Sequence, residues 1–322
     1  LRLGAGQRGD VDVRSRRQQP GGVGCAARRD HDARAGGQLP VACCGGASVE
    51  VTPRGAADAP GLLPAGTHVY ITALPGAEAE GLVSAAAAIR SGGCVPIPHI
   101  SARSIAVERQ LDELLGALVS EGGVDDVLVI GGSVKEQAGP YASSMDVLGS
   151  GLLERHGIRR AGVAGHPEGS PDIPRDAEDR ALAWKNAFAR DHEIELRIVT
   201  QFALASDPYL AYERRIRDAG NRLPVIAGLP GVTSPATLLK YGMACGIGPS
   251  LEILRKKSGG LLKLATTRQW KPTEIAEEIA VASAADPASL ISGMHLFLFG
   301  GLERTAEWLA EMRGAGAEAV TA

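Results

Sequence analysis

From Ala47 onward, short apolar runs rich in β-branched residues alternate with longer segments rich in Ala and Leu. Eight runs are predicted to be strands: 47–52, 68–74, 93–99, 125–131, 160–165, 195–202, 223–228 and 293–299. Helices are predicted at 78–91, 103–121, 143–156, 176–191, 207–219, 235–245, 249–257, 272–284 and 302–313. This regular alternation favours a parallel sheet whose strands are joined by crossover helices.

The number of strand–helix units narrows the fold class further. Eight units over about 275 residues suit a closed barrel better than an open doubly wound sheet. No GxGxxG motif follows a predicted strand, which argues against a dinucleotide-binding Rossmann domain. Aromatic content is only 4% and the chain has 42 Gly, as expected for packing between small and aliphatic side chains. We therefore predict an α/β chain folded as a (β/α)8 TIM barrel, with residues 47–322 forming the catalytic domain.

Residues 1–46 differ from the rest of the chain. They are rich in Arg, Gly, Gln and Pro, show neither helical nor strand periodicity, and do not begin with Met. We expect a disordered or non-native segment. A nucleic-acid-binding arm is the alternative, but four aspartates dilute its positive charge.

Charge and cysteine content limit the partners and the compartment. The formal net charge is −3, so no nucleic-acid partner is expected. No apolar run reaches the length of a membrane span, and no signal peptide is recognisable. The five cysteines form no CxxC pair and no disulfide-like framework. These features predict a cytoplasmic protein with no membrane partner.

Polar residues lie at the expected C-terminal ends of the strands, where barrel enzymes carry their active sites. They come from six different strands and are Glu50, Thr72, His99, Ser133, His166, Glu168 and Gln201. A carboxylate in a barrel strand is costly to bury without a partner. Glu50 is therefore either an outward-facing residue paired with Lys or Arg, or a proton donor whose pKa is raised by partial burial.

The other positions also have two interpretations each. His99 closes a strand and is structural or functional, and the loop that contains His166 and Ser170 can be an ordinary turn. The amide of Gln201 can donate and accept at once, which suits the edge of a pterin or a nicotinamide amide. A capping role for Gln201 is the alternative. The sequence contains no HExxH motif and no GxSxG motif, so neither a metal site nor a serine nucleophile is expected.

From Ala47 to the end, the chain resembles the 5,10-methylenetetrahydrofolate reductase family. Four motifs carry the resemblance in order and spacing: "SVEVTPR", "PHIS", "HPEGSP", and "IVTQF" followed by "DPYL". "GLPGVTSPATLLKY" and "HLFLFGG" occupy the positions of strands 7 and 8. The resemblance implies a TIM barrel that binds FAD. It also implies NADH or NADPH as reductant, interconversion of 5,10-methylenetetrahydrofolate and 5-methyltetrahydrofolate, and a homo-oligomer.

The resemblance also implies roles for single residues. Glu50 matches the acid that protonates N10 of the folate, and Gln201 matches the glutamine that binds folate and nicotinamide, with Phe202 bordering the same slot. The positions matched to flavin contacts are Thr72, His99, Tyr141, Ala142, Glu178 and Lys185. Ser133, His166 and Ser170 occupy further cofactor-site positions at which this chain departs from the family, and Ser133 also lies at a substrate position.

These departures lead to a hypothesis about the direction in which the folate reaction runs. The family's Arg-Gly-Asp at the end of strand 4 is Gly131-Gly132-Ser133 here, while its Tyr and His around strand 5 are His166 and Ser170. A carboxylate near the flavin pyrimidine ring disfavours the anionic reduced form, by about 3 kcal/mol at a dielectric near 20. Its replacement by Ser133 is therefore expected to raise the flavin potential and favour methylfolate oxidation. Alternatives are a pterin-binding barrel methyltransferase, a non-catalytic or flavin-free relative, and an unstable product.

Overall fold

The computed structural model describes residues 46–73, 76, 78–245 and 268–320. Eight parallel strands close into a barrel in sequence order, with β1 pairing both β2 and β8. The strands are β1 (Ser48–Val51), β2 (His68–Ile71), β3 (Val95–Ser101), β4 (Asp126–Ile130), β5 (Arg160–Gly165), β6 (Glu195–Thr200), β7 (Val225–Pro230) and β8 (Ile291–Phe297). The predicted (β/α)8 TIM barrel is confirmed. The segment predicted to be disordered or non-native, and the helix predicted at 249–257, lie outside the described residues.

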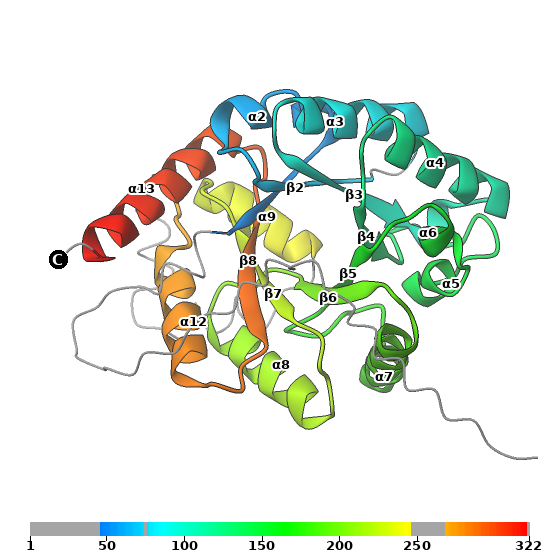
Figure 1. Ribbon diagram of the computed structural model, residues 1–322. Coiled ribbons are helices and arrows are strands. Elements are labelled where there is room, and N and C mark those ends of the chain that lie inside the picture. The colour runs from blue at the N-terminus through cyan, green and yellow to red at the C-terminus, as the bar shows by residue number, and fades with distance from the viewer. Residues whose placement is uncertain (1–45, 74–75, 77, 246–267, 321–322) are drawn as a thin grey trace, which may run out of the picture. The chain divides into compact units, whose positions relative to one another are not determined.

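Most of the described helices surround this barrel (Figure 1). Their bounds are α2 (Ala59–Leu62), α3 (Ala79–Ser91), α4 (Glu108–Ser120), α5 (Ser144–Leu148), α6 (Leu152–Arg155), α7 (Arg175–Asp191), α8 (Asp207–Asp218), α9 (Pro235–Ala244), α12 (Thr273–Ala285) and α13 (Leu302–Val320). Two short 3-10 turns, η1 (Pro53–Gly55) and η2 (Ala102–Ser104), follow β1 and β3.

Three predicted helices have different bounds in the structure, and one of them, the helix predicted at 302–313, runs on to Val320 as α13. The segment 143–156 is two short helices, because Gly151 adopts a left-handed φ of +74° that interrupts the helix between α5 and α6. The helix expected from residue 103 begins only at Glu108, since residues 102–104 form η2 instead. Strand 4 ends at Ile130, so Ser133 lies on the loop beyond the sheet.

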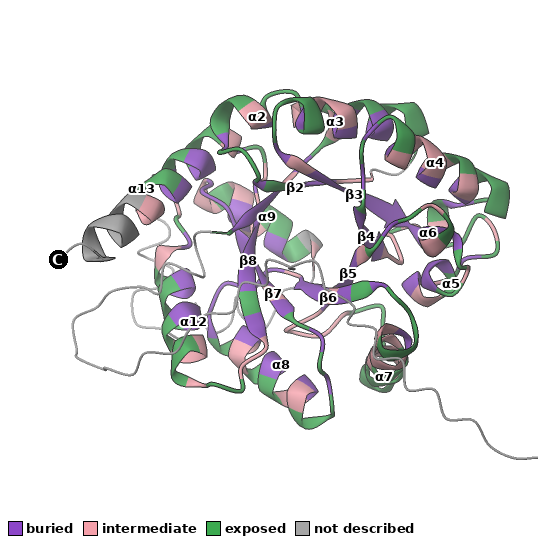
Figure 2. Ribbon diagram, viewed as in Figure 1, coloured by how far each residue is buried: buried purple, intermediate pink, exposed green. Residues whose placement is uncertain are grey.

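The strands are largely buried (Figure 2), and residues that alternate along them belong to two different apolar clusters. The larger lies between the strands and the surrounding helices, as expected for a sheet covered by crossover helices. A smaller cluster, which fills the barrel interior, contains Tyr70, Ile97, Leu128 and Val199. Side chains two residues along the same strand point the same way, so His99, two residues after Ile97, also points into the barrel.

The helix after β7 does not join the surrounding ring. Figure 1 shows α9 crossing the strands, and its Leu238 packs with Phe202 and Leu204 beyond the end of β6. Leu239, Phe297 and Phe299 join the same cluster. Helix α9 therefore covers part of the C-terminal mouth, and α12 packs beside α8 outside the barrel.

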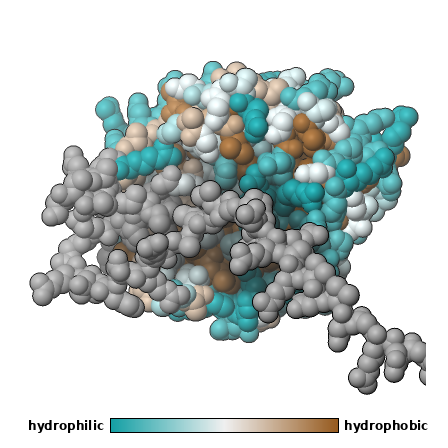
Figure 3. Space-filling model, in the orientation of Figure 1, coloured by the Kyte–Doolittle hydropathy of each residue, from teal (hydrophilic) through white to brown (hydrophobic). Residues whose placement is uncertain are grey.

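The described surface in Figure 3 is largely hydrophilic, with apolar residues in small separate patches. Among the described helices, none is both long and apolar enough to cross a membrane.

Candidate active site at the C-terminal mouth

Glu50 lies inside the barrel, near the C-terminal end of β1. Its Oε2 atom is 3.4 Å from Nε2 of His99 on β3 and 3.6 Å from Nε2 of His295 on β8. The carboxylate is 17% exposed, while the His295 side chain is completely buried. The interpretation of Glu50 as an outward residue paired with Lys or Arg is therefore wrong. Its nearest titratable partners among the described residues are two buried imidazoles.

The pKa of Glu50 is lowered, so the expectation that burial raises it is wrong. Burial does favour the neutral carboxyl, but the nearby imidazoles of His295 and His99 outweigh it. Because its pKa is lower in the folded chain, the Glu50 carboxylate stabilises the fold, fully so at pH values above its ordinary pKa near 4.5. That contribution is lost as the pH falls through the lower folded-state value. Burial likewise lowers the pKa of His99 despite the opposing charge of Glu50, which favours its neutral imidazole.

His295 is a site residue that the sequence analysis missed. Its Nδ1 atom lies 2.9 Å from the hydroxyl oxygen of Ser48, so serine, histidine and glutamate follow one another inside the barrel. The signal was present in "HLFLFGG", because a histidine in an apolar barrel strand needs a buried polar partner. Only the closure of β8 onto β1 identifies that partner as Glu50.

Gln201 follows β6 and lines a hollow of about 250 Å³ with His166, Ser170, Phe202 and Cys245. The side-chain oxygen Oε1 of Gln201 accepts a hydrogen bond of 2.9 Å from the backbone N–H of Phe202. The alternative role of Gln201, binding the backbone at the end of the strand, therefore accounts for its side-chain oxygen. Burial, followed by the charge of Glu50, raises the pKa of the Cys245 thiol, so Glu50 and this hollow share one electrostatic environment.

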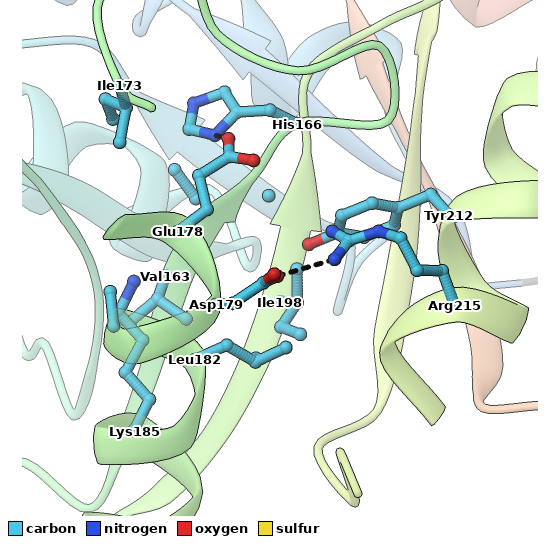
Figure 4. A pocket seen from close by; sticks show the side chains of 13 residues that line it. Val163, His166, Ile173, Glu178, Asp179, Leu182, Lys185, Ile198, Tyr212 and Arg215 are labelled. Atoms are coloured by element: carbon cyan, nitrogen blue, oxygen red, sulfur yellow. Dashed lines mark hydrogen bonds and ion pairs between the residues drawn. The ribbon is translucent and has the colours of Figure 1, made fainter. Parts of the chain in front are cut away.

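Three sequence-predicted cofactor residues line a second hollow, of about 70 Å³, between β5, α7 and α8, with Lys185 apart from the other two (Figure 4). His166 follows β5, and its Nδ1 atom is 3.0 Å from Oε1 of Glu178 on α7. Lys185 lies two turns further along the same helix. Burial lowers the pKa of Lys185 to about 8, against the opposing charge of Glu178. Burial in this hollow therefore disfavours the charged form of Lys185.

The low pKa of Lys185 predicts a stability effect. The unfolded chain binds the lysine proton up to its ordinary pKa of 10.5, so burial costs stability below about pH 8, and the cost disappears between pH 8 and 10.5. We expect Lys185→Met to raise the free energy of unfolding by about 1–3 kcal/mol at pH 7, and by much less near pH 10. Urea unfolding at both pH values measures this. Lys240→Met on α9 is the control, and an equal gain at both pH values would contradict the assignment.

Thr72 and His99 line a third hollow, of about 270 Å³, at the ends of β2 and β3. The Thr72 hydroxyl donates to the carbonyl of Val51 at 3.4 Å. His99 thus contacts Glu50 and also faces this hollow.

The remaining predicted residues lie on the loop between β4 and α5, and line none of these three hollows. Ser133 is exposed, whereas Tyr141 is buried, and its hydroxyl has no hydrogen-bond partner among the described residues. The N–H of Ala142 donates to Asp146 at 2.9 Å, and its carbonyl accepts from Arg103 at 3.0 Å. These hydrogen bonds hold the backbone at Ala142, while the buried Tyr141 hydroxyl has no partner among the described residues.

An aromatic wall borders the mouth next to Glu50. The ring of Phe297 meets His295 edge-on at 4.8 Å, and Phe202 contacts both Phe297 and Phe299. Phe299 stacks on Tyr241 of α9 at 4.4 Å. Phe299 also has a φ of +46°, a conformation that is strained for a bulky side chain. The wall could support a planar ring placed beside Glu50.

No family model matches the chain. The similar solved structures include two of dihydropteroate synthase from Thermus thermophilus, one of them in complex with 6HMPPP. Both are 17% identical and cover 83% of this chain and 92% of theirs, with TM-scores of 0.42 and 0.41. This low similarity carries no argument about substrate or reaction. The barrel is shown by its own closed sheet.

Proposed function

We propose that this chain is a flavin-dependent oxidoreductase that interconverts 5,10-methylenetetrahydrofolate and 5-methyltetrahydrofolate with NAD(P)H. The observation that carries the proposal is the position of Glu50, a buried carboxylate held at the mouth of a barrel by two histidines. Gln201 and the aromatic wall lie at the same mouth. Together they offer a proton-transferring group, an amide and apolar faces for a reduced pterin.

In this proposal Glu50 exchanges a proton with N10 of the folate. Towards methylfolate, the protonated carboxyl gives its proton to N10 as the five-membered ring opens to the iminium. In the reverse direction, the carboxylate takes the proton from N10 as that ring closes. The lowered pKa of Glu50 favours the carboxylate, which is the state needed for the reverse direction. This agrees with the bias towards methylfolate oxidation that the replacement of the family's Asp by Ser133 implies.

The chain's own groups fit an anionic ligand with hydroxyl groups, such as FAD. Lys185 is a half-buried cation with a lowered pKa, and Glu178, two turns earlier on α7, could accept hydrogen bonds from a ribose. The buried Tyr141 hydroxyl lacks a partner among the described residues. These residues would hold the cofactor, together with Thr72 at the second-strand end. FAD would supply hydride storage between the nicotinamide and the folate.

The exposure of Ser133 revises its expected influence on the flavin. A charge at an exposed position is screened by water, so the interaction falls from about 3 kcal/mol to about 0.8 kcal/mol at 5 Å. For a two-electron couple this corresponds to about 20 mV. Serine in place of aspartate would therefore adjust the flavin potential only modestly.

The first test is whether the purified chain binds FAD and transfers hydride. We expect a yellow protein with oxidised-flavin absorption that is bleached anaerobically by NADH or NADPH and by 5-methyltetrahydrofolate. Flavin binding without bleaching by either folate would favour a non-catalytic relative. Folate binding without flavin would favour a flavin-free enzyme or a pterin-binding methyltransferase.

A second test concerns the potential. We expect Ser133→Asp to lower the flavin midpoint potential by about 20 mV. Ser133→Asn is the control, because it adds similar volume without charge. A spectroelectrochemical titration of both variants measures the difference, and an unchanged or higher potential in Ser133→Asp would overturn the assigned position of Ser133.

A further inference from the structure

Beneath Glu50 the barrel interior holds a polar column where barrels usually carry aliphatic layers. The hydroxyl of Tyr70 on β2 accepts hydrogen bonds from Nε and Nη2 of Arg197 on β6, at 3.1 and 2.9 Å. Arg197 in turn pairs with Asp126 on β4 at 2.9 Å, and Asp126 is only 2% exposed. Arg197 of β6, supported by Asp126 of β4, therefore holds the Tyr70 hydroxyl from the side of the barrel opposite the candidate site.

The other end of Tyr70 reaches both histidines that flank Glu50. Its ring meets His295 at a centroid distance of 4.5 Å and an interplanar angle of 63°. It meets His99 at 6.2 Å and 77°. Both contacts are edge-to-face, so a tilt of the tyrosine ring would change the space available to each imidazole.

Hydrogen bonds to Glu50 do not hold these imidazoles tightly, so packing contributes to their direction, together with the 2.9 Å hydrogen bond between Nδ1 of His295 and the Ser48 hydroxyl. The Nε2 atoms of His99 and His295 are both buried, and neither has a hydrogen bond of ordinary geometry within the described part of the chain. Their separations from Oε2 of Glu50 are 3.4 and 3.6 Å. Small movements of either ring would therefore strengthen or weaken its effect on the carboxylate.

We propose that Tyr70 is a positioning residue for Glu50, with its ring held between the two histidines by the Arg197–Asp126 ion pair. The inference rests on the proposed function, in which Glu50 transfers the proton. Residues at the N-terminal end of the barrel would thereby set the protonation equilibrium at the C-terminal mouth without touching the substrate.

Titratable groups surround both ends of this polar column. Glu50 is faced by His99 from β3, His295 from β8, Tyr70 from β2 and the Cys245 thiol at the end of α9. At the lower end, Arg160 from β5 lies 3.6 Å from Asp126. His68 and Asp125 act on the same charges. Any of these groups could titrate in a Tyr70 variant, so a shift in its pH profile is attributed to Glu50 only after the titrations of the histidines have been measured.

The test is a double-mutant cycle of Tyr70→Phe and Arg197→Lys in the full chain. Tyr70→Phe removes the hydroxyl, and Arg197→Lys keeps the charge that Asp126 needs while removing the paired N–H donors. We expect each variant to shift the acid limb of the folate turnover profile by about one pH unit and to lower kcat about tenfold. We expect the double variant to resemble the single ones, because both changes break the same link.

The same variants are followed by NMR of ring-labelled histidine, which needs no folate activity. His99→Gln and His295→Gln assign the two signals among the seven histidines. Ile97→Val, in the same interior layer, controls for packing and should leave both titrations unchanged. Shifted titrations in Tyr70→Phe and Arg197→Lys support the positioning role even if the wild type turns over no folate, which would defeat only the proposed function. Wild-type titrations in both variants, or effects that simply add, would overturn the role.

Discussion

Replacing Glu50 by Gln is expected to lower folate turnover by about 10²- to 10⁴-fold, the usual contribution of a positioned acid or base. Glutamine keeps the volume and a hydrogen-bonding oxygen between His99 and His295, but it cannot exchange a proton with N10. Reduction by NAD(P)H involves no proton from this carboxylate and should keep its wild-type rate. Anaerobic stopped-flow measurement of the two half-reactions separates these outcomes.

The matched control is Glu195→Gln. Glu195 begins β6 and is exposed at the opposite end of the same barrel, so the substitution removes one carboxylate without touching the mouth. It should leave both half-reactions unchanged. Full folate turnover by Glu50→Gln would show that Glu50 is not the proton-transferring group, even if the flavin is retained.

Replacing Gly228 by Ala should destabilise the fold by about 3 kcal/mol, near the upper end for an overpacked core. An added Cβ would lie 2.0 Å from the carbonyl oxygen of Thr200 and 2.7 Å from Cε2 of Phe297. The backbone of Gly228 is also fixed, because its N–H donates to the Thr200 hydroxyl and its carbonyl accepts from Tyr209. The strand cannot move away without breaking these bonds.

Chemical denaturation of Gly228→Ala measures that cost, and Gly131→Ala is the control. A Cβ at Gly131 would meet nothing within 4 Å, and its φ does not require glycine, so we expect a change within about 0.5 kcal/mol. If the two variants are equally stable, the contact between β6 and β7 is looser than described. Because Phe297 belongs to the aromatic wall, Gly228→Ala should also weaken folate binding in any fraction that remains folded.

The alternation of apolar strands and Ala-rich helices was enough to predict the barrel. Its eight strands were located within a few residues, since a buried parallel strand is a short β-branched run whatever its neighbours are. The helix at 143–156 was wrong, because one glycine in a left-handed conformation outweighed the helical pattern around it. Ser133 was placed at the end of a strand and lies on an exposed loop, because strand ends depend on hydrogen bonding that no local pattern shows.

The sequence by itself determined that the chain is a (β/α)8 barrel, because strand and helix patterns alternate eight times along it. It also placed Glu50, His99 and Gln201 near strand ends, because each lies at or just beyond the end of a short apolar run. Only the tertiary structure decided what Glu50 meets. His295 is 245 residues away and reaches it because β8 closes on β1, and the two histidines reverse the expected direction of its pKa shift. Whether burial or a neighbouring charge dominates a carboxylate depends on distances of a few ångströms between strands. Those distances are set by barrel closure and are absent from any local pattern.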